Sequence, residues 1–200
     1  MTRTSGIVAL LTDYGLQDAY VGILKGALLS VHPAARLVDL THEIPPQDVR
    51  EAARVLDAAH PYFPDGTVFV AVVDPGVGTD RAILAVETDR HTFLAPDNGL
   101  LGFLRDRGAI RRVIQVTRPR YFRHPVSSTF HGRDIFAPVA AWISKGLGIA
   151  RLGPRGALSQ GVEDALQVDA RGIRGRVVSI DRFGNLITNI SSTVLGATKN

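Results

Sequence analysis

The sequence predicts an α/β protein in which a mostly parallel sheet flanked by helices is followed by a small, incomplete all-β domain. In the first part of the chain, apolar runs typical of buried strands alternate with segments whose apolar residues recur at helical spacing. After a glycine-rich stretch the pattern changes to short strands separated by turns. We therefore expect an α/β domain over residues 1–150, a linker over 151–163 and the start of a β domain over 164–200.

The α/β domain is expected to begin as a strand, a helix and a second strand, which is a βαβ unit. The first strand covers residues 7–11, the helix ends at Pro33, and the second strand covers residues 36–40. A second helix is expected after Pro45-Pro46, with an apolar stripe from Val49 to Ala59, and it ends at His60-Pro61. The next strand, residues 67–73, is continuously apolar and β-branched, as expected of a strand buried on both faces.

The remaining elements are expected to be shorter. A polar turn joins two closely spaced strands into a hairpin, and two helices and another strand complete the α/β domain. In the β domain, the last two strands flank the turn Asp181–Asn185. In chain order the expected elements are strands 82–86 and 92–95, helix 100–107, strand 112–116, a helix around 135–143, and strands 165–168, 173–180 and 186–190.

Composition places the chain among ordinary water-soluble proteins. Its 200 residues are 45% hydrophobic and 21% charged. The absence of cysteine excludes disulfides and thiolate sites, and it agrees with a reducing cytoplasm. The apolar run near the N-terminus breaks at Asp13 and is too short for a signal or transmembrane helix. We expect a cytoplasmic protein without a membrane partner.

The net charge of +4 raises the question of a nucleic-acid partner. The arginines are scattered, and the densest group, between Arg105 and Arg123, lacks the interleaved aromatic residues that stack on bases. A solvated basic face explains this group better. We expect a small-molecule ligand and no nucleic acid.

A candidate site lies where the buried strand 67–73 ends, at Asp74-Pro75-Gly76. Proline cannot continue the ladder, and glycine lets the backbone turn sharply near a ligand. Asp13 follows the first strand in the same way. Because open α/β sheets bind ligands at the carboxyl ends of their strands, both carboxylates are expected at that edge. Asp74 could equally serve only to cap a turn.

Two later segments also carry polar groups with two interpretations. Asp97 and Asn98 stand at the start of a short helix, where both residue types cap well, so a structural role competes with ligand binding. His131 precedes an amphipathic helix, and helix amino ends favour anions and developing negative charge. A lone histidine at such a place is more often structural.

Other chemistries lack their signatures. The six histidines are dispersed without HExxH or His-x-His, so no metal site is expected. No GxSxG elbow is present, and the PGVG segment lacks the lysine of a P-loop. The groups that remain are an acid, a guanidinium and an imidazole: Asp74, Arg81 and His131.

Five motifs in order resemble one known family. They are TDYG at 12–15, DPGVG at 74–78 followed by Arg81, APDNGLL at 95–101, STFHGRDIFAP at 128–138 and DRFGN at 181–185. Together they resemble the S-adenosyl-L-methionine (SAM) hydroxide adenosyltransferases, also called SAM hydrolases, which are related to the fluorinase and chlorinase. The resemblance covers essentially the whole chain.

The resemblance implies a reaction and the residues that perform it. Such enzymes cleave SAM to adenosine and L-methionine by attack of water or hydroxide on the ribose C5′, with no metal and no cofactor. By resemblance, Asp74, Arg81 and His131 hold and activate the nucleophile, and Asp13 binds the ribose hydroxyls. The remaining substrate contacts implied are Asp181 and Asn185, on the methionine and nucleoside parts, and Asn98 and Phe130 in the pocket lining.

The resemblance also implies an assembly and leaves alternatives open. Family members form homotrimers with sites between subunits, and they continue past the last residue of this chain to complete the β domain. The halogenase relatives carry serine where this chain has Gly132, which favours hydroxide over halide here. The alternatives are a SAM- or nucleoside-binding module without turnover, a halide-using relative, and a metal-dependent nucleotide hydrolase.

Overall fold

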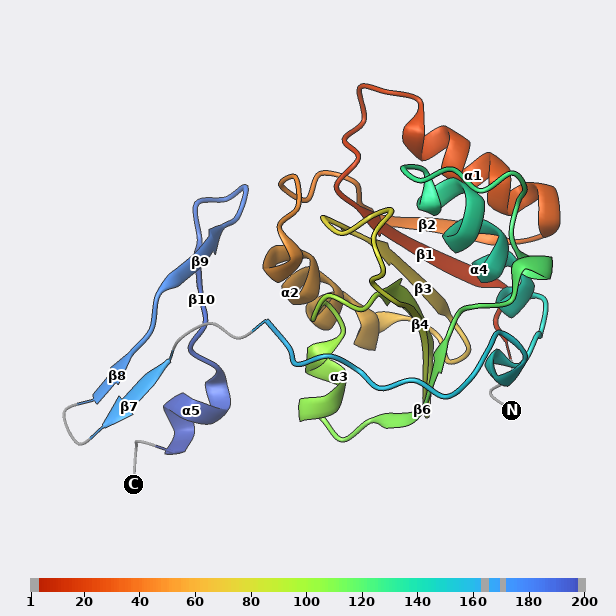
Figure 1. The fold of residues 1–200 in the computed structure, drawn as a ribbon. Helices are drawn as coiled ribbons and strands as arrows, with labels where there is room; N and C mark the ends of the chain where they lie inside the picture. The colour runs from red at the N-terminus through yellow and green to blue at the C-terminus, as the bar shows by residue number, and fades with distance from the viewer. Residues whose placement is uncertain (1–3, 163–165, 170–171, 198–200) are drawn as a thin grey trace. The chain divides into compact units, whose positions relative to one another are not determined.

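The computed structural model describes residues 4–162, 166–169 and 172–197 (Figure 1). The chain forms two compact units, Met1–Val162 and Glu163–Asn200. Each unit has its own sheets. They are described separately below.

The first unit is built on a six-stranded sheet in the order β2-β1-β3-β5-β4-β6. Strands β1, β2, β3 and β5 are parallel, whereas β4 is antiparallel to both of its neighbours. This confirms the mostly parallel sheet and the hairpin expected around residues 82–95. The strands are β1 (Ile7–Thr12), β2 (Arg36–Thr41), β3 (Val68–Val72), β4 (Ile83–Thr88), β5 (Thr92–Pro96) and β6 (Ile110–Gln115).

Helices cover both faces of this sheet (Figure 1). Alternate residues of β3 pack in opposite directions, because successive side chains of a strand point to opposite faces. Val68, Val70 and Val72 pack in one buried cluster with α1 (Tyr20–Val31) and α4 (Ala137–Ser144). The residues between them pack in a second cluster with α2 (Val49–Ala59) and α3 (Gly102–Asp106). The continuous apolar run of β3 is therefore explained by burial on both sides.

The parallel strands bring three aspartates to one edge. Asp13 follows β1, Asp97 follows β5, and Asp74 stands just beyond β3. These strands are neighbours in the sheet, so their carboxyl ends lie together. The loop after β3 also approaches the segment before α4, because a Cβ added to Gly78 would lie 2.5 Å from the carbonyl oxygen of Ser128. Gly78 has a φ of +80°, so glycine is needed there for two reasons.

The helix expected around residues 135–143 begins earlier and in a different form. A π-helical turn, η3 (Gly132–Phe136), follows His131 and leads directly into α4. Wide turns of this kind are rare and are often found at functional sites. Single 3-10 turns, η1 (His60–Tyr62), η2 (Pro119–Tyr121) and η4 (Ile149–Arg151), complete the unit.

The second unit contains two separate two-stranded antiparallel sheets and a short helix. The expected strand 173–180 is wrong, because it is two strands that pair in different sheets. The break is at Gly175, where a Cβ would lie 2.4 Å from Asn189 Oδ1, and the next amide, of Arg176, donates to that oxygen. The elements are β7 (Gln167–Asp169), β8 (Gly172–Arg174), β9 (Val177–Ile180), β10 (Leu186–Thr188) and α5 (Ser192–Ala197).

In the second unit the structure contains the hairpin that the sequence predicts and a helix that it does not predict. The turn Asp181–Asn185 joins β9 to β10 as an antiparallel hairpin, as predicted. Helix α5 was not expected in an all-β domain. The first residue of the expected strand 165–168, the ends of the expected β domain at 164 and 200, and residue 163 of the expected linker lie outside the described residues.

Candidate active site

Asp74, Arg81 and His131 form one hydrogen-bonded set. Arg81 Nε lies 3.0 Å from Asp74 Oδ1 and 2.9 Å from Oδ2, and Arg81 Nη2 also donates to Asp74 Oδ2. The same Nη2 lies 2.8 Å from His131 Nδ1. The side chains of Asp74 and Arg81 are only 5% and 11% exposed. A carboxylate and a guanidinium that are largely buried stay charged when paired in this way.

The contact with Arg81 determines the form of the His131 ring. A guanidinium can only donate hydrogen bonds, so Nδ1 of His131 must accept, and a neutral ring then carries its hydrogen on Nε2. Burial, and next the positive charge of Arg81, lower the pKa of His131 below its usual value. His131 is therefore a neutral imidazole at pH 7 whose Nε2–H can donate to a ligand.

The segment before His131 is held in place by Asp134, which is fully buried. Asp134 accepts from the amide of Ser127 at 2.9 Å and from two nitrogens of Arg133 at 2.7 and 2.9 Å. The hydrogen bonds from Arg133 hold the pKa of Asp134 below its usual value, so it stays a carboxylate. The sequence reasoning did not single out Asp134; the signal available was an acid at the start of an otherwise apolar helix.

A pocket of about 360 Å³ is lined by residues 13–14 after β1 and by residues 129–130, directly before His131; Asp74, Arg81 and His131 themselves are not among its lining residues. Asp13 and Phe130 line it, as the resemblance implied, and the Phe130 ring lies 5.9 Å from that of Tyr20 and beneath the Arg133 guanidinium at 5.1 Å. The volume lies within the range usual for small-molecule sites. The lining residues that the sequence reasoning missed are Tyr14, Tyr20, Ile23, Leu24, Thr129 and Arg133.

The two other predicted residues of the first unit have different surroundings. Asp13 faces the pocket and accepts the amide of Gln47 at 2.9 Å through Oδ2. Asn98 is not among the residues that line the pocket. Its side chain ties two loops together instead, donating to the carbonyl of Val73 at 2.8 Å and accepting the amide of Leu100 at 3.2 Å. Asn98 thus fixes the backbone directly before Asp74.

Asp181 and Asn185 lie in the second unit, where they bind each other. Asp181 Oδ2 accepts from Asn185 Nδ2 at 2.7 Å, and Oδ1 accepts the amides of Phe183 and Asn185. These bonds, the side chain of Asn185 first, lower the pKa of Asp181. The structure brings this pair together as a turn; their substrate contacts stay a prediction.

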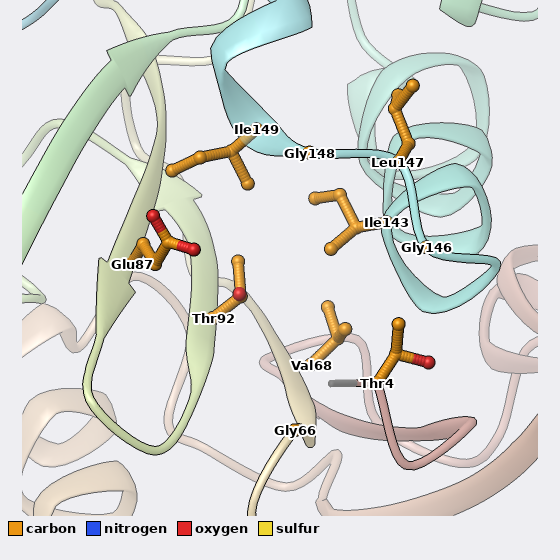
Figure 2. A pocket seen from close by; sticks show the side chains of 10 residues that line it. All are labelled: Thr4, Gly66, Val68, Glu87, Thr92, Ile143, Gly146, Leu147, Gly148 and Ile149. Carbon is orange, nitrogen blue, oxygen red and sulfur yellow. The ribbon is translucent and has the colours of Figure 1, made fainter. Parts of the chain in front are cut away.

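A second pocket lies at the opposite edge of the sheet from Asp74 (Figure 2). Val68 and Thr92, at the amino ends of β3 and β5, line it together with residues 146–149 after α4. Its volume of about 40 Å³ gives room for about three water molecules and not for a nucleoside. The ligand site is therefore assigned to the edge that carries Asp13 and Asp74.

The described residues contain neither a cluster suited to a metal ion nor a helix suited to a membrane. Within the described residues, no three His, Asp or Glu side chains gather closely enough to hold a metal ion. None of the described helices has the length and apolar character needed to cross a membrane.

A family model matches most of the first unit. The SAM hydroxide adenosyltransferase N-terminal domain matches residues 8–153, which include β3, His131 and all of β1 except Ile7. The chain belongs to this family. The match contains the first four of the five motifs and the whole Asp74–Arg81–His131 set.

Relatives of this chain carry two kinds of name. A protein named (R)-S-adenosyl-L-methionine hydrolase from Thermus thermophilus is 42% identical, over 94% of this chain and 76% of the relative. One of the same name from Salinispora arenicola is 41% identical, over 90% and 70%. A fluorinase from Nocardia brasiliensis is 30% identical, over 98% and 75%.

A solved structure has the same fold. The crystal structure of an uncharacterized conserved protein from Thermotoga maritima superposes with a TM-score of 0.89 at 38% identity. The superposition covers 96% of this chain and 75% of that one. The predicted fold class is confirmed by this likeness and by the sheet described above.

Proposed function

We propose that this protein hydrolyses S-adenosyl-L-methionine to adenosine and L-methionine. The observation that carries the proposal is the hydrogen-bonded set Asp74–Arg81–His131 at the strand edge; a pocket of about 360 Å³ is lined by Asp13 at the same edge and by Phe130, directly before His131. The chain also shares about 40% of its residues with proteins named as (R)-SAM hydrolases.

In this reaction the attacking water must be deprotonated, whereas the leaving group departs as a neutral thioether and needs no general acid. The water oxygen forms a bond to the ribose C5′, and the C5′–S electron pair moves to the sulfonium, which leaves as the neutral thioether of methionine. Bulk water has a pKa of about 15.7, so it must lose its proton during the attack. We assign that proton to Asp74, because the guanidinium can only donate hydrogen bonds and Nδ1 of His131 is already bonded to Arg81.

Arg81 and His131 have separate tasks. Arg81 is bonded to both partners at once, so it aligns the carboxylate with the imidazole. The Nε2–H of neutral His131 donates to the water and stabilises the charge that develops on its oxygen. Because its Nδ1 is occupied by Arg81, His131 does not compete with Asp74 for the proton.

Substrate binding is assigned to both units. Asp13, at the pocket wall, accepts hydrogen bonds from the ribose hydroxyls, and Phe130 and Tyr20 provide aromatic surface for the nucleoside. By resemblance, Asp181 and Asn185 contact the methionine and nucleoside parts of the substrate, and an anionic Asp181 suits an ammonium group. We assign no cofactor beyond the substrate. The absence of cysteine favours a location in the cytoplasm. The family resemblance implies a homotrimer with sites between subunits. Light scattering of the purified chain tests the trimer.

One assay tests the function. Purified protein incubated with SAM is expected to release adenosine and methionine in equal amounts, measured by chromatography. Asp74→Asn keeps the shape of the side chain but removes its basicity, so we expect kcat to fall by at least about a hundredfold. Asp80→Asn is the matched control, because Asp80 is exposed on the same loop, and its rate should equal that of the parent.

Other outcomes of this assay identify the alternatives. Calorimetric binding of adenosine without any product points to a binding module. A halide-dependent adenosyl product points to halogenase chemistry. Activity abolished by a chelator points to a metal-dependent hydrolase, and an Asp74→Asn variant as fast as the parent contradicts the assigned mechanism.

A further inference from the structure

Tyr14 lines the pocket and also contacts Gly132, the residue directly after His131. It belongs to the turn after β1 and lines the pocket beside Asp13. The ring packs edge-on against Tyr20, with centroids 6.3 Å apart. The family motif TDYG contains Tyr14, yet neither the sequence nor the mechanism above gives its hydroxyl a task.

The hydroxyl of Tyr14 is seated on Gly132, directly after His131. A Cβ added to Gly132 would lie 2.1 Å from Tyr14 Oη but 3.2 Å from Cζ and 3.6 Å from Cε2. The hydroxyl makes the closest approach, and the contact with Cζ is tight enough to require a shift of a few tenths of an ångström. Any side chain at position 132 and the Tyr14 hydroxyl exclude each other from the same space.

The charges around Tyr14 keep its proton in place. Burial raises the pKa of the phenol, and the carboxylates of Asp13 and Asp74 raise it further. The negative charges of Asp13 and Asp74 both favour the protonated phenol. The Tyr14 hydroxyl therefore keeps its hydrogen and can donate a hydrogen bond at any pH near neutrality. The Tyr14 hydroxyl therefore lies beside the residue that follows His131, on a side chain close enough to Asp74 for that carboxylate to raise its pKa.

We propose that the Tyr14 hydroxyl, seated on Gly132, is a further catalytic group of this enzyme and donates a hydrogen bond to the attacking water. The proposal rests on the function proposed above. Tyr14 does not lose its proton: Asp74 takes the proton of the water, while Tyr14 and His131 each donate a hydrogen bond to its oxygen. Gly132 is required because it leaves room for this hydroxyl.

The variant Tyr14→Phe tests the chemical part, because it keeps the ring and its packing and removes only the hydroxyl. We expect kcat for adenosine release to fall by about tenfold to a hundredfold, with KM changed less than about threefold. Tyr62→Phe is the matched control, since Tyr62 is exposed and belongs to η1, outside the set and the pocket. Its kcat should match that of the parent.

The variant Gly132→Ala tests the steric part without depending on activity. In the parent background its methyl group meets Tyr14 Oη, so we expect a lower melting temperature. In the Tyr14→Phe background the remaining contact at 3.2 Å is tolerable, so the melting temperature should recover. The double variant should stay slow, because the donor is still missing.

The outcomes separate this proposal from the proposed function. A parent that releases no adenosine overturns both. A parent that works together with a Tyr14→Phe variant of equal kcat overturns only the role of Tyr14. Equal melting temperatures of Gly132→Ala and parent would remove the steric basis and overturn it as well.

Discussion

At the scale of single residues, the decisive feature is that Arg81 fixes both of its partners. It neutralises a buried carboxylate and holds the imidazole in one tautomer. The residues that support this set do so through the backbone: Asp134 anchors the segment before His131, and Asn98 anchors Val73 beside Asp74. Replacing such anchors is expected to disturb catalysis without touching the substrate.

The lowered pKa of His131 makes a pH prediction. Protonation would place a hydrogen on Nδ1 against the Arg81 guanidinium, so the folded protein resists it. The neutral ring, and with it the activity, should be fully present at pH 7 and be lost only as the pH falls below about 6.5, the unperturbed value. A ¹H NMR titration of the His131 ring, assigned with His131→Gln, measures this directly. A midpoint at or above 6.5 would contradict the assigned tautomer and burial.

Residues that belong to a short sequence motif could be assigned a role from the sequence, whereas residues whose role depends on a tertiary contact could not. The motifs placed Asp74, Arg81 and His131 by resemblance, and the structure brings these three together across the chain. Asn98 could not be distinguished from a cap, because whether its amide reaches Val73 depends on tertiary packing. The contact between Tyr14 and Gly132 could not be predicted for a similar reason, because it joins residues more than a hundred positions apart.

At the scale of elements, the ends of the strands divide the sheet into a functional and a structural edge. The edge opposite Asp74 holds an aromatic cluster, in which the His91 ring lies 5.2 Å from Phe69, 5.9 Å from His60 and 6.2 Å from Phe93. His91 is 1% exposed, and neither of its ring nitrogens has a hydrogen-bond partner in the described structure. Such a ring must remain neutral in the folded protein.

This cluster predicts acid sensitivity. Burial, followed by the charges of Arg90 and His60, lowers the pKa of His91 to about 4, while Asp65 opposes the shift. Between pH 6.5 and 4 the unfolded chain binds the proton and the folded one does not, so stability falls as the pH falls. The loss through His91 should be about 3 kcal/mol at pH 4. Denaturant unfolding of the parent and of His91→Leu at pH 7 and 4 measures it; an equal pH effect in both would refute it.

The elements themselves were predicted where one pattern determined them. Strands such as β3 are recognisable because burial on both faces leaves a continuous apolar run. The split between β8 and β9 was missed because the apolar pattern continues across Gly175, and only the contact with Asn189 shows the break. The π-helical turn after His131 was missed because its residues also suit an α-helix.

At the scale of the whole molecule, the two units differ in how much apolar surface they bury. In the first unit all of β3 is buried between two helical layers. In the second unit Ile180, Phe183 and Leu186 are 64%, 89% and 62% exposed around one hairpin. The change to short strands predicted that the second unit buries less apolar surface than the first. The strand pattern alone does not identify the surface that packs against these exposed side chains.

The contrast predicts very different local stabilities along the chain. A two-stranded hairpin with exposed apolar residues is marginal in water, whereas a central strand opens only with its whole domain. In dilute solution, amides of β9 and β10 should exchange with deuterium at least about a hundredfold faster than those of β3. Mass spectrometry of peptic peptides measures this, with edge strand β6 as the control for strand position. If protection of the hairpin rises with protein concentration, subunit contacts cover it, as the proposed trimer requires. Hairpin amides that exchange as slowly as those of β3 in dilute solution would refute the predicted contrast.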